Sequence, residues 1–227
     1  SAITSVAFSR DGSRIVAGDA TGTIKTWDAI SGRETLTLHA AHEHSVKALA
    51  VSPDGTRIAY GGGDLFTRNN FMHMCDFTLG KASSPVSTLA EHYSPITSLA
   101  FSPDSKQLLS KTNDIRIWDI WDTTPVVQEN NLKNSFISSL AFSPDGIPIL
   151  SNSEDRLCIW DAHLATQHHV PLVGHGGEIM SQTFSHDGTR FLFGSDDKTI
   201  WVWNFVQVNV MSPPPAHTAS VTSVAFS

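Results

Sequence analysis

The apolar residues of this chain alternate with polar residues in short runs, and the runs come in pairs separated by a turn. In the first pair, Ile3, Val6 and Phe8 precede the turn, and Ile15 and Ala17 follow it. Alternation of this kind is typical of half-buried β-strands, and no comparable helical periodicity occurs along the chain. The turn reads Ser-Arg-Asp-Gly here and Ser-Pro-Asp-Gly in later copies. Because proline fixes φ and glycine accepts a positive φ, the pattern predicts tight antiparallel hairpins.

This phrase occurs six times, and each of the five complete copies continues into a second hairpin and a less regular fourth strand. Four strands in about 42 residues, without helices, are typical of a propeller blade. In the third copy Ser105 replaces the turn glycine, so we expect that hairpin either to be strained by about 1 kcal/mol or to have a different shape. The predicted fold is all-β, with five complete four-stranded units plus the first strand of a sixth in a single domain. The units span approximately residues 1–40, 41–90, 91–131, 132–173 and 174–215, with a partial unit at 216–227.

A Trp-Asp pair near the end of the third strand and a histidine nine residues before the end of the first strand accompany the repeat. The pairs are Trp27-Asp28, Trp118-Asp119, Trp160-Asp161 and the variant Trp203-Asn204, with Cys75-Asp76 in the second unit. The histidines are His42, His92, His175 and His217, with Lys133 in the fourth unit. On these residues the chain resembles the WD-repeat β-propeller family over essentially its whole length. Because that family most commonly has seven blades, we expect this chain to be part of a larger ring, with further blades supplied by the parent chain or by a second copy.

The resemblance gives the recurring polar residues a structural role, not a catalytic one. It implies a buried hydrogen-bonded chain that joins a histidine, a hydroxyl, an aspartate and the tryptophan, and that locks the geometry of the blade. The third unit has the most complete set, His92, Ser110, Asp114 and Trp118. In the fifth unit Phe193 stands where the hydroxyl would be. The other expected members are Ser151, Asp155 and Trp160 in the fourth unit, His175, Asp197 and Trp203 in the fifth, and His42 in the second.

Charge and composition narrow the classes of partner. The formal net charge is −7, and no basic stripe is visible, which disfavours nucleic acid as the main partner. No apolar run approaches the roughly 18 residues of a membrane-spanning helix, and no signal peptide is recognisable at the N-terminus. Cys75 and Cys158 are too few for a disulfide framework, and we expect both to be free, buried thiols. An intracellular, cytoplasmic location is the resulting expectation.

The eleven histidines raise the question of a metal site. The dense clusters are His42-Glu43-His44 and His168-His169. A zinc site needs three or four converging ligands, and neither cluster supplies them by itself. We therefore expect no metal, no other cofactor and no catalytic residues.

The expected function is that of a non-catalytic scaffold or sensor module, as in signalling proteins, that binds other proteins on a loop face of the propeller. Function on such a fold comes from side chains placed on the loops. The enlarged second unit places an aromatic residue and an arginine in a loop, and Trp121 follows the Trp-Asp pair of the third unit. The candidate binding residues are Glu43, Phe66, Arg68, Tyr93, Phe136, Glu178 and Trp121.

Two other functions stay open at this point. An enzyme using the central funnel would need convergent carboxylates or histidines on the first strands, where Lys47 is the one charged residue. A glycan-binding propeller would need exposed aromatic residues at equivalent positions of each unit. Tyr93 and Phe136 fit that pattern, whereas Glu43 and Glu178 break it. The sequence does not identify the partner protein.

Overall fold

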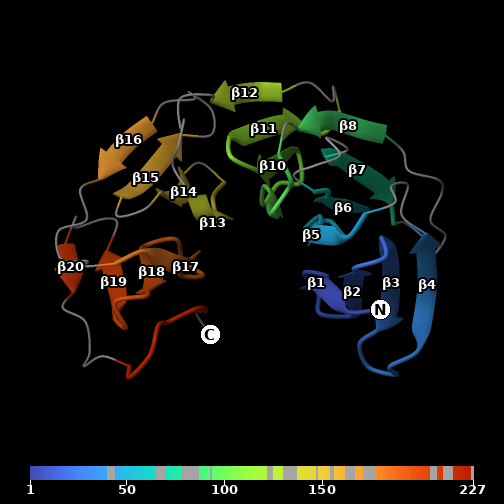
Figure 1. The fold of residues 1–227 in the computed structure, drawn as a ribbon, viewed down its shortest axis with the longest axis horizontal. Helices are drawn as coiled ribbons and strands as arrows, with labels where there is room; N and C mark the ends of the chain where they lie inside the picture. The colour runs from blue at the N-terminus through green and yellow to red at the C-terminus, as the bar shows by residue number, and fades with distance from the viewer. Residues whose placement is uncertain are drawn as a thin grey trace. The chain divides into compact units, whose positions relative to one another are not determined.

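A computed structural model describes residues 1–39, 44–64, 70–77, 87–92, 94–121, 125–129, 137–146, 148–153, 156–161, 167–170, 177–204, 209–211 and 217–225. The chain divides into two compact units, Ser1–Asn131 and Leu132–Ser227. The first unit contains three four-stranded sheets and the second contains two, and in each sheet the strands follow one another in chain order (Figure 1). All the strand pairs are antiparallel, which confirms the prediction of an all-β fold of five four-stranded units.

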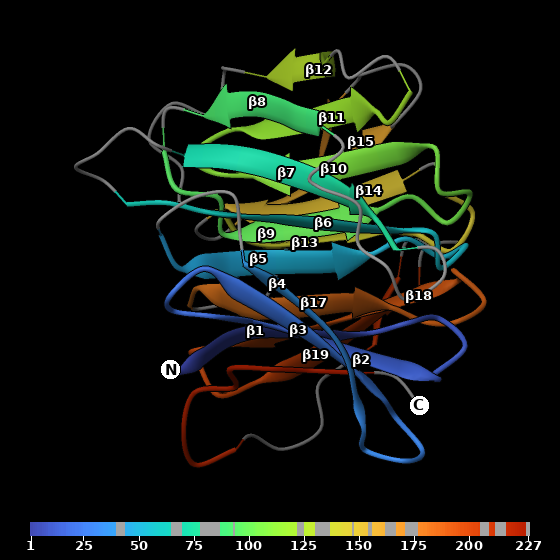
Figure 2. The same ribbon diagram turned by 90° about the vertical axis from the view of Figure 1, so that its right-hand side faces the viewer.

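The first unit holds the first, second and third sheets, and Figure 2 shows the first two most clearly. The first sheet comprises β1 (Ile3–Phe8), β2 (Arg14–Asp19), β3 (Thr23–Asp28) and β4 (Glu34–His39). The second comprises β5 (Val46–Val51), β6 (Arg57–Gly62), β7 (Asn70–Asp76) and β8 (Ser87–His92). The third comprises β9 (Ser98–Phe101), β10 (Gln107–Lys111), β11 (Ile115–Asp119) and β12 (Pro125–Glu129).

The second unit holds the fourth and fifth sheets. The fourth comprises β13 (Ile137–Phe142), β14 (Pro148–Ser153), β15 (Arg156–Asp161) and β16 (Gln167–Val170). The fifth comprises β17 (Ile179–Phe184), β18 (Arg190–Ser195), β19 (Ile200–Asn204) and β20 (Asn209–Met211).

The turn between the first two strands of each sheet is fixed by a serine and an aspartate. In the first sheet Ser9 Oγ donates to Asp11 Oδ1 at 2.5 Å, and Arg14 N donates back to Ser9 Oγ at 2.9 Å. Gly12 closes the turn with a φ of 68°. The third sheet keeps the same turn although Ser105 stands at the glycine position with a φ of 60°. The hairpin is therefore not reshaped, so the expected strain is the alternative that the structure supports.

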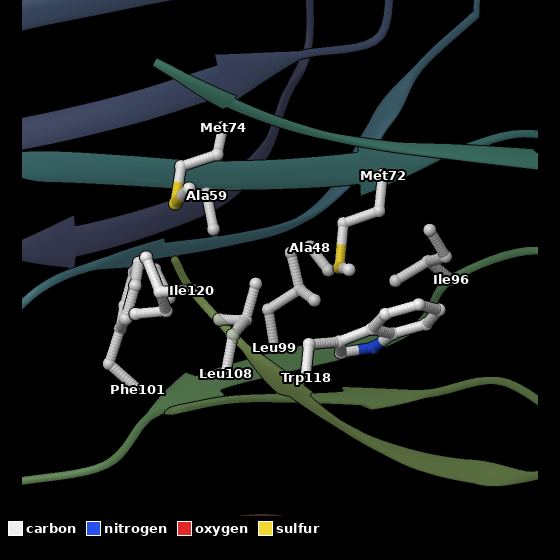
Figure 3. Packing of buried hydrophobic residues seen from close by; sticks show 11 residues of the cluster. Ala48, Ala59, Met72, Met74, Ile96, Leu99, Phe101, Leu108, Trp118 and Ile120 are labelled. Atoms are coloured by element: carbon white, nitrogen blue, oxygen red, sulfur yellow. The ribbon is translucent and has the colours of Figure 1, made fainter. Parts of the chain in front are cut away.

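The core of the first unit lies between successive sheets. Figure 3 shows Met72 and Ala48 of the second sheet facing Leu108 and Trp118 of the third, all of them buried. The sheets approach closely because small residues of one sheet face branched residues of the next. A Cβ on Gly18 would lie 2.5 Å from Val46 Cγ1, which leaves room for glycine alone.

The structure differs from the prediction at the sixth copy of the phrase. Residues 217–225 form no strand, whereas the pattern predicts one from Val221. It nevertheless lies against the fifth sheet. Val221 is buried, and its N–H donates to Ser195 O at 3.0 Å.

Candidate functional site

The structure brings His92, Ser110 and Trp118 together between the second and third sheets. His92 ends β8, Ser110 lies on β10, and Trp118 lies on β11. Trp118 Nε1 donates to Ser110 Oγ at 2.8 Å, and Ser110 Oγ lies 3.1 Å from His92 Nε2. The His92 and Trp118 rings meet edge to face, with centroids 5.7 Å apart. Because Ser110 Oγ accepts the indole N–H, its own proton is available to donate to His92 Nε2.

Asp114 lies on the other side of the His92 ring. His92 Nδ1 is 3.8 Å from Asp114 Oδ1, which is beyond hydrogen-bond distance. Thr112 Oγ1 donates to the same carboxylate, and Arg116 Nε donates to Asp114 Oδ2 at 3.0 Å. Burial raises the pKa of Asp114, but the contacts of His92 and Thr112 and the charge of Arg116 outweigh it and hold the pKa below its ordinary value.

The chemistry of this set follows from its burial. A serine, a histidine and an aspartate are the residue types of a hydrolase triad, in which the hydroxyl must reach a substrate. Ser110 and His92 have no exposed surface, and Ser110 Oγ is already engaged by the indole. Hydrogen bonds closed off from solvent in this way join two sheets and satisfy a buried indole. A stabilising role for these residues stays a prediction.

The fourth and fifth sheets carry less of this set. In the fourth sheet, Ser151 pairs with Cys158, and Ile149 pairs with Trp160. The third sheet has the same register, in which Ser110 pairs with Arg116 and Leu108 pairs with Trp118. In the fifth, Phe193 is buried at the hydroxyl position. The other expected members of these two sheets, Asp155 and His175, lie outside the described residues, as does His42 of the second sheet.

The polar contacts of the fifth sheet differ from those of the third. Thr199 Oγ1 donates to Asp197 Oδ1 at 2.5 Å, and Trp201 Nε1 donates to Thr199 Oγ1 at 2.7 Å. Trp203, at the position of Trp118, packs against Phe191 with the ring centroids 5.6 Å apart. The same position in the second sheet belongs to Cys75, which is free and buried, and burial raises the pKa of its thiol to about 11.

Two of the candidate protein-binding residues lie in the part of the chain that the structure describes. Glu178 is exposed, and its carbonyl accepts the N–H of Asp196. Trp121 is 72% exposed, and its backbone N–H donates to Asp119 Oδ1 at 2.8 Å. The remaining candidates lie outside the described residues: Glu43, Phe66, Arg68, Tyr93 and Phe136.

Sequence reasoning missed the partner of Trp121. The Arg57 guanidinium lies over the Trp121 ring, 4.4 Å from its centroid. A related contact lies between the first and second sheets, where the Arg14 guanidinium is 4.7 Å from the centroid of Phe77, one position earlier than Trp121 in its repeat. The signal was present in the sequence, because both arginines begin the second strand of a copy. The contact itself was not recognisable from the sequence, because it joins an arginine of one copy to an aromatic residue of the next copy.

The described residues show no metal site and no membrane-spanning helix. No group of three or more His, Cys, Asp or Glu among them could hold a metal ion. Nor does the part of the chain that the structure describes contain a helix long and apolar enough to cross a membrane.

Repeated four-stranded antiparallel sheets that pack in chain order within each unit define a repeat protein built from propeller blades. A histidine–serine–tryptophan contact joins the second sheet to the third. The model of the WD domain, G-beta repeat, matches residues 1–28, 32–66, 83–119, 127–161 and 166–204. This chain belongs to the WD-repeat family.

Curated relatives share this repeat. The chain is similar to the serine-threonine kinase receptor-associated protein of Gallus gallus, 31% identical over 52% of this chain and 31% of that protein. The protein of the same name from Dictyostelium discoideum is 23% identical over 100% of this chain and 73% of its own length. The target of rapamycin complex subunit wat1 of Schizosaccharomyces pombe is 26% identical over 81% of this chain and 56% of its own. The matched stretch spans about a third of the length of the first of these relatives.

Proposed function

We propose that this chain is a non-catalytic platform that binds other proteins through exposed turns of its blades. Membership of the WD-repeat family supports this, as do the names of the relatives, which describe a receptor-associated protein and a subunit of a complex. The burial of Ser110 and His92 supports a structural role for the residues that most resemble catalytic groups.

The observation that carries the proposal is the Trp121–Arg57 pair. Large aromatic side chains and arginine are the residues most enriched among those that dominate the energy of protein interfaces. Trp121 leaves most of its surface in water while its backbone is held by Asp119 and its ring is covered on one face by Arg57. A tryptophan fixed in this way contributes apolar area to a complex with little loss of side-chain entropy. The partner is therefore a protein with an apolar pocket that receives the free part of the ring.

The chain offers a matched control for a test of this site. Ile30 stands two residues after Asp28, as Trp121 stands two residues after Asp119, and it is 92% exposed. Trp121→Ala should weaken binding of a captured partner protein by roughly 30-fold or more, the effect typical of a central interface residue. Ile30→Ala should leave it unchanged. The measurement is affinity capture from a native extract, followed by the Kd of the purified partner for each variant.

Equal binding by wild type and Trp121→Ala would show that another surface is used. The loops that precede the first strand of each sheet are then the second candidate, with Glu178 as their described member. Glu178→Lys should in that case weaken the same complex.

A cytoplasmic location also belongs to this proposal, and the free Cys75 thiol supports it. Cell fractionation with an antibody to the chain tests that part separately.

A further inference from the structure

Two arginines at the same position of successive sheets cover aromatic rings in different ways. Arg14 is the first residue of β2, and Arg57 is the first residue of β6. Each guanidinium lies over a ring of the following sheet, Arg14 at 4.7 Å from the Phe77 centroid and Arg57 at 4.4 Å from the Trp121 centroid. The two contacts differ in how much of the arginine and of the ring stays available to another molecule.

The contact of Arg14 is closed. Phe77 is 2% exposed, and Arg14 Nη1 donates to its carbonyl oxygen at 3.3 Å. The third sheet has the buried Ile120 at the position of Phe77. The two positions correspond because each backbone N–H donates to the residue before the second strand, Phe77 N to Thr56 O at 2.6 Å and Ile120 N to Lys106 O at 3.0 Å. At this position the repeat therefore buries an apolar residue.

The contact of Arg57 is open. Trp121 follows Ile120, so its ring lies outside the buried position, and it is 72% exposed. A guanidinium carries five N–H donors, but Arg57 Nη1 has only the Met74 Sδ, a weak acceptor, at 4.0 Å. Within the described ranges no ion pair involves Arg57, and its guanidinium donates to no oxygen atom. Most of its donors are therefore available to an acceptor from another molecule.

The carboxylates of the adjoining turns are engaged by those turns themselves. Asp54 Oδ1 accepts a serine hydroxyl at 2.5 Å and a backbone N–H at 3.0 Å. Asp104 Oδ1 accepts a serine hydroxyl at 2.6 Å, and its Oδ2 lies 4.0 Å from Lys106 Nζ. Asp119 Oδ1 accepts the backbone N–H of Trp121. The acidic residues farther away matter little to a ligand at Arg57, because salt screens exposed charges beyond about 8 Å at physiological ionic strength.

We propose that Arg57 and Trp121 together bind a protein segment in which an aspartate or glutamate side chain stands beside apolar residues. The N–H groups of a guanidinium lie in its plane, so an arginine that packs on a ring can still donate to both oxygens of a carboxylate. The apolar residues of the segment then pack on the part of the Trp121 ring that Arg57 leaves uncovered. This inference rests on the proposed function, since it gives the chemistry of the partner that the Trp121 surface binds.

The probe for the test is a displayed library of disulfide-cyclised peptides, selected on the immobilised chain. Peptides whose binding is lost with Trp121→Ala are retained and synthesised with amidated C-termini, so that side chains carry the only carboxylates. We expect these peptides to contain an aspartate or a glutamate next to a large apolar residue.

A double-mutant cycle then tests the pairing with Arg57. Replacing the acidic residue of the peptide by its amide should weaken binding to wild type by roughly tenfold. The same replacement should weaken binding to Arg57→Gln by less than about twofold, because the group that reads the charge is already absent. Arg57→Lys keeps the charge without the planar fork and should recover only part of the affinity.

Arg14→Gln is the matched control, since it removes the arginine at the same position of the closed contact. It should bind both peptides as wild type does, and circular dichroism establishes that every variant is folded. Trp121-dependent peptides without an acidic residue would overturn the inference, as would equal losses on amide replacement in wild type and Arg57→Gln. Either result leaves the proposed function standing. A selection in which no peptide depends on Trp121 would contradict the Trp121 surface itself, and both proposals would then fail.

Discussion

The third and fifth sheets hold a tryptophan at the same position in two different ways. In the third, the buried Trp118 donates its indole N–H to Ser110 Oγ. In the fifth, Trp203 packs on Phe191, which stacks in turn on Phe193 with centroids 6.0 Å apart. Phe193 stands where Ser110 does, so a single residue of the second strand decides between a hydrogen bond and ring packing.

This difference shows what the repeat requires at the position of Trp118 and Trp203. Both sheets bury a large aromatic residue, whereas the neighbour that fixes it is free to vary. A hydrogen bond fixes the orientation of the tryptophan ring, but a substitution that removes its partner leaves a buried polar group unsatisfied. Ring packing stabilises the tryptophan through buried apolar area, and a substitution that removes one of the rings leaves a cavity. The two sheets should therefore respond differently to equivalent substitutions.

The largest effect is expected in the fifth sheet. Phe193 has almost no exposed surface and contacts Phe191, so Phe193→Ala should lower the free energy of unfolding by about 3–5 kcal/mol through the cavity that it leaves. Urea unfolding measures this. Leu192→Ala, at the partly exposed neighbouring residue, is the control and should cost less. Equal losses in the two variants would contradict the ring-packing account.

A smaller effect is expected in the third sheet. His92→Ala should lower the free energy of unfolding by about 1–3 kcal/mol, because it removes the partner of Ser110 and leaves buried polar groups unpaired. His39, an exposed histidine that ends β4, provides the control, and His39→Ala should have little effect. Thermal and urea melts give the values, and binding of a partner protein should survive in the folded variant. Unchanged stability with loss of a chemical activity would argue for a catalytic His92.

The sheets should also differ in acid. The pKa of Asp114 is held below its ordinary 3.8, so the Asp114 carboxylate is protonated at a lower pH in the folded chain than in the unfolded chain. The contribution of Asp114 to stability is therefore present above that value and is lost as the pH falls below it. Asp187, in a turn of the fifth sheet, has its pKa lowered to about 2 by hydrogen bonds from Ser185 and Thr189, but it is exposed.

A comparison of asparagine variants tests this difference. Asp114→Asn should be destabilised relative to wild type at neutral pH, and the gap should close as the pH falls from 4 towards 2. Asp187→Asn should show the same sign with a smaller amplitude, because solvent screens its contacts. Unfolding curves at a series of pH values measure both gaps. A gap for Asp114→Asn that widens in acid would reverse the sign argued here.

The repeat made the sheets predictable, because alternation and turn residues act within one copy. It also grouped His92, Ser110, Asp114 and Trp118, which the structure places in one cluster. Contacts between copies were harder to foresee. The packing of Arg57 on Trp121 depends on how neighbouring sheets are placed, which no local pattern encodes.

The last part of the comparison concerns the turns, where Ser105 of the third sheet and Gly188 of the fifth have φ values of 60° and 69°. A positive φ costs a non-glycine residue about 1 kcal/mol. Ser105 recovers part of that cost, since its Oγ accepts the N–H of Asp54 in the neighbouring sheet at 3.1 Å. Ser105→Gly loses both the strain and the bond, so its stability should stay within about 0.5 kcal/mol of wild type. Ser105→Ala keeps the strain and loses the bond, so it should be the less stable variant of the two. Thermal melts of both variants decide the point, and an alanine variant as stable as the glycine variant would show that the bond to Asp54 contributes nothing.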